Sequence, residues 1–286
     1  MLKHLSLCSG IGGLDLAAEW AGFETVAHCE IDEYANRVLA KNFRGGVNLL
    51  DIRTITASRI NEYGIDPTDI TVISAGFPCQ PYSLAGKGAG DRDERDLWGE
   101  VARVLGEIKP RWFVGENTPG LFSRENQRYF RRILSDITAL GYSIGWGIWG
   151  ACDVGAPHKR NRIFLVAYAH GKRRKTDELY EHGACQALDK TWGRYEFSGA
   201  NCISGSISYA DSKRKYEQEG IEQEKRKRTF NSSWWEVEPA VGRVANGVSN
   251  RVDRLRGLGN AVVPYQAYLI FKAIAEFERD YENRTI

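Results

Sequence analysis

Cys79 is the strongest candidate for covalent chemistry in this sequence. It lies in GFPCQPYS (76–83), directly after the apolar run DITVISAGF (69–77), and a glycine-punctuated stretch follows it. A cysteine thiol is a slow nucleophile at its usual pKa of about 8.5 unless a neighbouring group stabilises the thiolate. Three interpretations are open at this point: a buried packing cysteine, a metal or redox site, or a nucleophile served by a closing loop.

Three further side chains could assist such a thiol. Glu116 ends the apolar run WFVGE (112–116), and Arg160 and Arg162 lie in GAPHKRNRIF, just before a later apolar run. Each residue alone has an ordinary structural explanation, as core packing, a turn cap or a surface charge. These three residues and Cys79 all lie at the ends of predicted strands, and this shared position favours an active site over a coincidence of four unrelated residues.

The N-terminal stretch LCSGIGGLDLAAEWAG (7–22) predicts a strand, a glycine turn and a helix. Glu30 closes the second strand, where a carboxylate can accept hydrogen bonds from ribose hydroxyls. A dinucleotide fingerprint would need glycine at position 15, where Asp15 stands, and an acidic residue at a helix start disfavours pyrophosphate. A nucleoside cofactor without phosphates, S-adenosylmethionine, fits better. Asp51 ends the third strand and could accept a hydrogen bond from an adenine amino group.

The elements that must position these residues alternate between strands and helices over residues 1–169. The expected strands are 4–9, 25–30, 47–50, 69–77, 112–116, 142–149 and 162–169, and the expected helices are 13–21, 32–43, 96–108 and 123–141. This alternation predicts an α/β fold with a doubly wound, mostly parallel sheet covered on both faces. Ligands of such sheets bind outside the carboxyl ends of the strands.

A compositional change near residue 170 predicts an inserted domain. The tract from there to residue 250 is polar, and within KRKYEQEGIEQEKRKR (213–228) seven Lys and Arg outnumber four Glu. PYQAYLIFKAIAEFERDY (264–281) is an amphipathic helix whose apolar face must return to the core. We therefore expect a catalytic, cofactor-binding domain at 1–169, a small domain at 170–255 and a returning C-terminal segment at 256–286.

Composition describes a protein of the reducing cytoplasm. The 286 residues carry a net charge of only +2, which neither demands nor excludes a polyanionic partner. The six cysteines have no CxxC spacing, which argues against a disulfide framework or a zinc ribbon. His182 and Cys185 have a ligand-like spacing without a second pair, so no metal is expected. No stretch approaches the ~18 apolar residues of a membrane helix, and no signal peptide is evident.

Seven motifs in a fixed order resemble those of the bacterial and phage cytosine-C5 DNA methyltransferases. They are SGIGGLDLA, CEIDEYA, LDI, GFPCQPYS, ENTPG, GAPHKRNRIF and RLRGLGNAVVP, within 1–169 and 250–281. GFPCQPYS with a later EN and R-x-R is highly specific, and the D/N/S-P-P-Y/F tetrapeptide of amino-directed DNA methyltransferases is absent. The resemblance implies a Rossmann-like, S-adenosylmethionine-dependent methyltransferase fold with an inserted target-recognition domain.

The resemblance also implies a mechanism. Cys79 would add to C6 of a flipped-out cytosine, Glu116 would stabilise the ring at N3, Arg162 would hold the carbonyl, and Arg160 would engage ring or phosphate. Gln80, Ser83 and Arg160 are the expected DNA contacts. The partner would be double-stranded DNA, bound by a cytoplasmic monomer in a bacterial cell or phage-infected host, with a companion restriction endonuclease a further possibility.

The cofactor contacts implied by motif position come from both ends of the chain. They are Cys8, Gly10, Ile11, Gly13, Glu30, Ile31, Asp51, Ile52, Pro78, Leu97, Asn260 and Ala261. The product would be S-adenosyl-L-homocysteine. Cys8 and Ile31 stand where family members often carry aromatic residues, and His158 stands where glutamine is common.

Two other functions stay open as alternatives. An RNA cytosine methyltransferase can use the same scaffold, but the CFT tripeptide of the transfer-RNA group is absent from 170–250. A non-catalytic DNA-binding relative would be favoured if the nucleophile or the acid were missing, and both are present. A dinucleotide-dependent oxidoreductase conflicts with Asp15 and leaves Cys79 unexplained.

Overall fold

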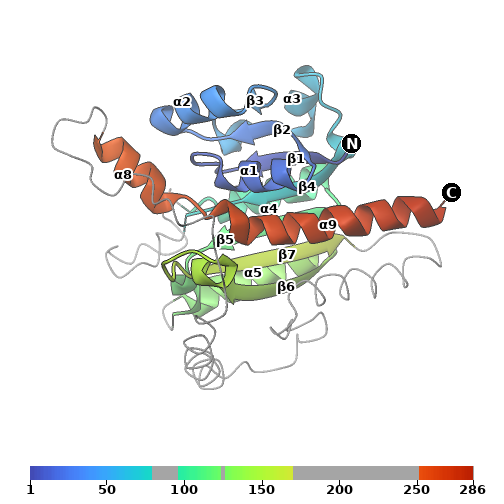
Figure 1. Ribbon diagram of the computed structural model, residues 1–286. Helices are drawn as coiled ribbons and strands as arrows, with labels where there is room; N and C mark the ends of the chain where they lie inside the picture. Colours follow the sequence, from blue (N-terminus) through green and yellow to red (C-terminus); the bar gives the residue numbers. More distant parts are fainter. Residues whose placement is uncertain (79–95, 124–125, 170–250, 286) are drawn as a thin grey trace.

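A computed structural model of the chain describes residues 1–78, 96–123, 126–169 and 251–285 (Figure 1). In chain order, the elements are β1 (Lys3–Leu7), α1 (Gly13–Trp20), β2 (Glu24–Cys29), α2 (Glu33–Asn42), β3 (Val47–Asn48), η1 (Ile52–Thr54), α3 (Ala57–Glu62), η2 (Pro67–Asp69), β4 (Ile70–Ala75), α4 (Trp98–Ile108), β5 (Trp112–Asn117), η5 (Pro119–Phe122), α5 (Gln127–Ala139), β6 (Tyr142–Trp149), η6 (Ala151–Val154), β7 (Arg162–Ala169), α8 (Arg251–Asn260) and α9 (Pro264–Thr285). Each predicted strand and helix is present, β6 and β7 with the predicted bounds and the others with shifted ends, and the helices α3 and α8 were not predicted.

The strands form one seven-stranded sheet in the order β3-β2-β1-β4-β5-β7-β6. β1 to β5 pair in parallel, whereas β7 runs antiparallel to both β5 and β6. The predicted α/β class and the mostly parallel sheet are therefore confirmed. Because β7 is reversed, its first residue lies at the same edge as the last residues of the parallel strands.

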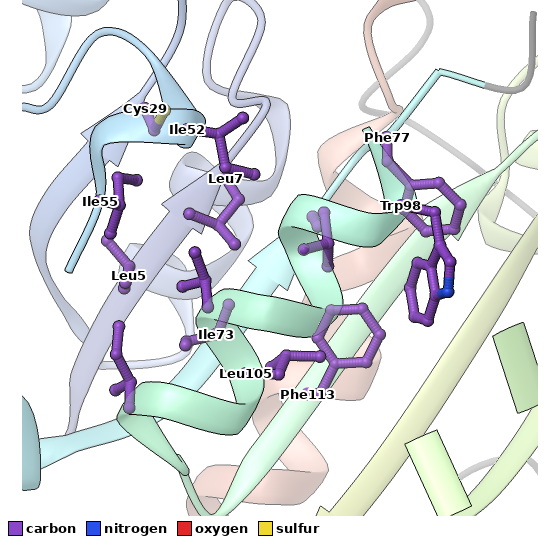
Figure 2. Packing of buried hydrophobic residues seen from close by; sticks show 14 of the residues in the cluster. Leu5, Leu7, Cys29, Ile52, Ile55, Ile73, Phe77, Trp98, Leu105 and Phe113 are labelled. Carbon is purple, nitrogen blue, oxygen red and sulfur yellow. The ribbon is translucent and has the colours of Figure 1, made fainter. Parts of the chain in front are cut away.

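One face of the sheet is covered by α4 and α5. Trp98 and Leu105 of α4 pack with Phe113 of β5 and Ile73 of β4 in a buried cluster that also includes residues of β1 (Figure 2). α4 has this apolar side because its buried residues recur at helical spacing. The cluster fixes the strands whose carboxyl ends carry the candidate site.

The opposite face is covered by α1 and α9, which lie side by side in front of the sheet in Figure 1. Ile270, Phe271 and Ile274 of α9 are fully buried there. The apolar side of α9 thus packs against the sheet, as expected of an amphipathic helix.

A buried carboxylate fastens the far end of α9 to the sheet. Glu278 has no exposed surface, accepts a hydrogen bond of 2.7 Å from Trp112 Nε1 and forms an ion pair with Arg111. Burial of a carboxylate is tolerated only when it is paired in this way.

Among the described helices, none is both long enough and apolar enough to cross a membrane. Within the same residues, no group of three or more His, Cys, Asp and Glu side chains could hold a metal ion.

Candidate active site

A cavity of about 750 Å³ opens at the carboxyl edge of the sheet. It is lined by residues that follow β1, β2, β4 and β5, by η1 and by the end of α8. The lining includes every residue that the sequence predicted for the cofactor: Cys8, Gly10, Ile11, Gly13, Glu30, Ile31, Asp51, Ile52, Pro78, Leu97, Asn260 and Ala261. Glu116 and Arg162 line the same cavity. The volume is typical of small-molecule sites.

The glycine turn after β1 is held against the end of β2 by Glu30. Gly10 has a φ of +56°, a backbone conformation that favours glycine, and its N–H donates to Glu30 Oε2 at 2.8 Å. The N–H of Asp32 donates to Glu30 Oε1 at 2.8 Å. Two backbone donors therefore fix the carboxylate in the cavity wall.

Asp15 does not belong to this cavity. It is fully buried in the first turn of α1, where Asp15 Oδ2 accepts a hydrogen bond of 2.9 Å from the hydroxyl of Ser6. Burial raises its pKa to about 7. The sequence argument that placed an acidic charge beside the ligand was wrong about its location, because the side chain turns into the core.

The third strand ends in a turn that places a carboxylate and an apolar side chain together. Asp51 caps η1 by accepting a hydrogen bond of 3.0 Å from the N–H of Arg53, while Ile52 beside it is buried. Across the cavity entrance, Ile31 is 68% exposed. Burial raises the pKa of Cys8 to about 12, so this thiol contributes apolar surface and no thiolate at neutral pH.

Glu116 and Arg162 form a buried ion pair at the end of β5. Arg162 Nε lies 2.8 Å from Glu116 Oε1, and both side chains are largely buried. Burial raises the pKa of Glu116 to about 7, although the positive charges of Arg162 and Arg160 pull it down. The carboxyl group can therefore hold or release a proton near neutral pH.

The chain that leads toward Cys79 is fastened to the strand that carries Glu116. Asn117 is buried, and its Nδ2 donates to the carbonyl oxygen of Phe77 at 2.9 Å. Phe77 itself packs on Trp98 with ring centroids 5.1 Å apart. The backbone two residues before Cys79 is thus fixed at the cavity. Cys79, Gln80 and Ser83 lie outside the described residues.

Arg160 is placed differently from Arg162. It does not line the cavity, and its Nη2 donates to the carbonyl oxygens of Leu258, Gly259 and Ala261. The predicted contact of Arg160 with a base or a phosphate stays a prediction.

Three features of the cavity were missed by the sequence analysis. Tyr34 lines it from α2, Asn117 anchors Phe77, and Arg256 of α8 forms an ion pair with Asp32 at the start of α2. Asn117 could have been noticed, because it directly follows Glu116. The pairing of Arg256 with Asp32 joins residues more than two hundred positions apart and has no local signal.

Comparison with known proteins places this geometry in a family. Residues 2–258 match the model of the family described as C-5 cytosine-specific DNA methylase. Type II methyltransferase M.NgoBI of Neisseria gonorrhoeae is 38% identical over 173 residues, which are 59% of this chain and 51% of that protein. The chain spans about half the length of the curated relatives it matches.

Solved structures agree in fold. A protein described as a DNA modification methyltransferase encoded within a prophage of E. coli is 29% identical, with a TM-score of 0.52 over 59% of this chain and 47% of that one. Spodoptera frugiperda DNMT2 is 18% identical, with a TM-score of 0.58 over 96% of this chain and 99% of that one. The second likeness concerns the fold alone.

Proposed function

Because the chain belongs to the C-5 cytosine-specific DNA methylase family, we propose that it transfers a methyl group from S-adenosylmethionine to C5 of cytosine in double-stranded DNA. One observation carries the proposal. The glycine turn and the ion pair of Glu116 with Arg162 line the same cavity, so a bound cofactor and an acid of suitable pKa would lie side by side.

The residues of the cavity fit S-adenosylmethionine. Glu30 and Asp51 offer carboxylate oxygens to ribose hydroxyls and to the adenine amino group, and Ile11 and Ile52 offer apolar surface to the adenine ring. Gly10 has no side chain and a Cβ there would meet nothing within 4 Å, so a ligand can approach its backbone closely. When bound, the cofactor supplies an activated methyl group.

The residues of this chain would prepare the cytosine for that methyl group. Cys79, as the thiolate, adds to C6 and forms a covalent C–S bond, which makes C5 nucleophilic. Glu116 in its protonated form donates a hydrogen bond to N3 and stabilises the charge that the addition moves into the ring. Arg162 holds the carbonyl oxygen of the base. After methylation, loss of the C5 proton to water or hydroxide expels the thiolate and restores the aromatic ring.

The target base must leave the helix for this attack. A cytosine stacked in a duplex exposes no face to the thiol, so it is flipped out at a cost of a few kcal/mol. We assign contacts with the DNA backbone or the vacated space to Gln80 and Ser83. The Lys- and Arg-rich residues 213–228 would contact phosphates within a target-recognition domain at 170–255. These segments lie outside the described residues.

The wider setting of the activity is also proposed. We also propose that the enzyme is cytoplasmic and monomeric and that a companion restriction endonuclease accompanies it. The reaction would need no metal.

Sequencing of methylated cytosines tests the proposed function directly. The protein is incubated with mixed-sequence duplex DNA and S-adenosylmethionine, and the DNA is then sequenced after bisulfite treatment. Protected cytosines within one short sequence are expected. Absence of protected cytosines with folded protein that binds the cofactor would contradict the proposal.

The variant Cys79→Ser tests the covalent step. It should abolish turnover and the trapping of protein on DNA that contains 5-fluorocytosine, because a hydroxyl is a far weaker nucleophile than a thiolate. Cys152→Ser, which changes a cysteine of η6 that does not line the cavity, is the matched control and should retain both properties. Turnover by Cys79→Ser at the wild-type rate would remove Cys79 from the mechanism.

A further inference from the structure

We infer that Arg160 is a positioning residue that holds one wall of the cofactor cavity. The inference rests on the proposed function. It assigns Arg160 to the cofactor side of the site, whereas the motif alone suggests a contact with the target base or a phosphate.

The guanidinium of Arg160 binds the end of helix α8. One nitrogen, Nη2, lies 3.3 Å from the carbonyl oxygen of Leu258 and 2.8 Å from that of Gly259, and it also contacts the carbonyl of Ala261. The last carbonyls of a helix have no partner inside the helix, and they carry the negative end of its dipole. A half-buried guanidinium is therefore well suited to hold this end in place.

The segment that Arg160 binds is the cavity wall itself. Gly259, Asn260, Ala261 and Val262 line the cavity. The wall packs tightly against the glycine turn, since a Cβ on Gly13 would lie 2.7 Å from Val262 Cγ1. A displacement of this wall would change the shape of the cavity directly.

The backbone of Arg160 is tied to the same segment. Gln266 at the start of α9 is fully buried, and its Nε2 donates to the carbonyl oxygens of Trp149 at 2.9 Å and Arg160 at 3.3 Å. Arg160 also has a φ of +32°, which a residue with a side chain rarely adopts. The side chain of Arg160 thus binds the end of α8, and its carbonyl oxygen binds the start of α9, so both sides of the loop between these helices are held.

Arg160 also connects the wall to the acid. Arg162 follows it by two residues and pairs with Glu116 at 2.8 Å. A single short stretch of backbone therefore carries one arginine that binds the cavity wall and one that binds the carboxyl group. The wall and the ion pair should shift together when this stretch moves.

Titration with S-adenosyl-L-homocysteine in the absence of DNA tests the inference. Isothermal titration calorimetry measures the Kd for this ligand. Arg160→Ala should raise this Kd about tenfold, because that is the factor expected when a charge-assisted hydrogen bond is lost. Lys159→Ala removes the neighbouring exposed charge and should leave the Kd within about twofold of wild type. Arg160→Lys, which keeps the charge but ends one bond short of the position of Nη2, should fall between them.

Two further readouts separate positioning from a general loss of structure. Guanidinium chloride at millimolar concentration should restore part of the affinity of Arg160→Ala for the ligand. With the ligand saturating, Arg160→Ala should bind duplex DNA no more weakly than Lys159→Ala does. If Arg160→Ala fails to fold, the Arg160→Lys titration decides the question.

Failure of the inference about Arg160 can be distinguished from failure of the proposed function. Wild-type affinity for S-adenosyl-L-homocysteine in Arg160→Ala, together with weakened DNA binding, would overturn the inference and return Arg160 to the DNA side. Absence of binding by the wild-type protein would overturn the proposed cofactor, and the inference with it.

Discussion

Glu116 lies among groups that act on its pKa in opposite directions. Burial favours the neutral acid, whereas the arginines at 160 and 162 favour the carboxylate, and the balance raises its pKa to about 7. An acid with this pKa is half protonated at neutral pH, which suits a group that must donate to a ring nitrogen.

We expect Glu116→Gln to lower kcat by about 10²-fold or more, because an amide cannot supply the proton. The protonated fraction of Glu116 falls as the pH rises through about 7. The ratio of wild-type kcat/KM to that of Glu116→Gln should therefore decrease between pH 6 and pH 9. Steady-state methyl transfer from tritiated cofactor measures both.

Glu62→Gln, at an exposed position of α3, is the matched control and should follow the wild-type profile. A ratio for Glu116→Gln that does not change with pH would contradict a titrating acid at position 116.

Part of the site could be predicted at the level of single residues. Glu116 and Arg162 follow from residue type and strand position, and both line the cavity. The direction of the Arg160 side chain could not be predicted, because it depends on carbonyls about one hundred residues further along the chain. The direction of the Asp15 side chain was also not predicted, although its hydrogen-bond partner Ser6 lies only nine residues earlier, on β1.

At the scale of elements, the reversal of β7 brings the arginines to the acid. Glu116 pairs with Phe164 and Asn117 with Ile163 in the antiparallel ladder, so Arg162 lies just beyond the end of β5. A parallel strand would have placed Arg162 at the opposite edge. Apolar runs predict that a strand exists, but they do not give its direction, and the convergence could not be derived from the runs alone.

The attachment of α9 to the sheet gives a prediction about stability. Glu278→Ala should lower the free energy of unfolding by about 3 kcal/mol, because it leaves Trp112 Nε1 without its buried acceptor and removes one ion pair of Arg111. Arg111→Ala should cost a similar amount, about 3 kcal/mol, because it removes the positive charge that faces the fully buried carboxylate of Glu278. Urea unfolding at equilibrium measures both.

Glu276→Ala provides a control on the same helix. Its carboxylate is 58% exposed and lies 3.9 Å from Lys272, so its loss should change the free energy of unfolding by less than about 0.5 kcal/mol. Equal losses for Glu276→Ala and Glu278→Ala would show that the buried carboxylate does not anchor α9.

At the scale of the whole molecule, the two ends of the chain build one cavity. Segments 8–13 and 257–262 both contribute to its lining and pack against each other, since a Cβ on Gly257 would lie 3.1 Å from Ile11 Cγ2. The mostly parallel sheet was predictable from the alternating pattern. The contact between the two ends was indicated only by the family motifs, because no local pattern records a contact over such a separation.

S-adenosyl-L-homocysteine should therefore protect both ends together. In hydrogen exchange followed by mass spectrometry, peptides that cover 8–13 and 257–262 should slow to a similar degree when the ligand is added. A peptide that covers α5 (127–139), none of whose residues lines the cavity, should not change. Protection confined to the N-terminal peptide would contradict a shared cavity.

The antiparallel direction of β7 also determines where another domain could be grafted into this chain. Ala169 ends β7 beside Arg111, at the edge of the sheet away from the cavity, whereas α8 begins the return on the cavity side. A graft that replaces the proposed target-recognition domain would join the chain at the end of β7 and at the start of α8, so the ladder of β5 with β7 that brings Arg162 to Glu116 would be kept.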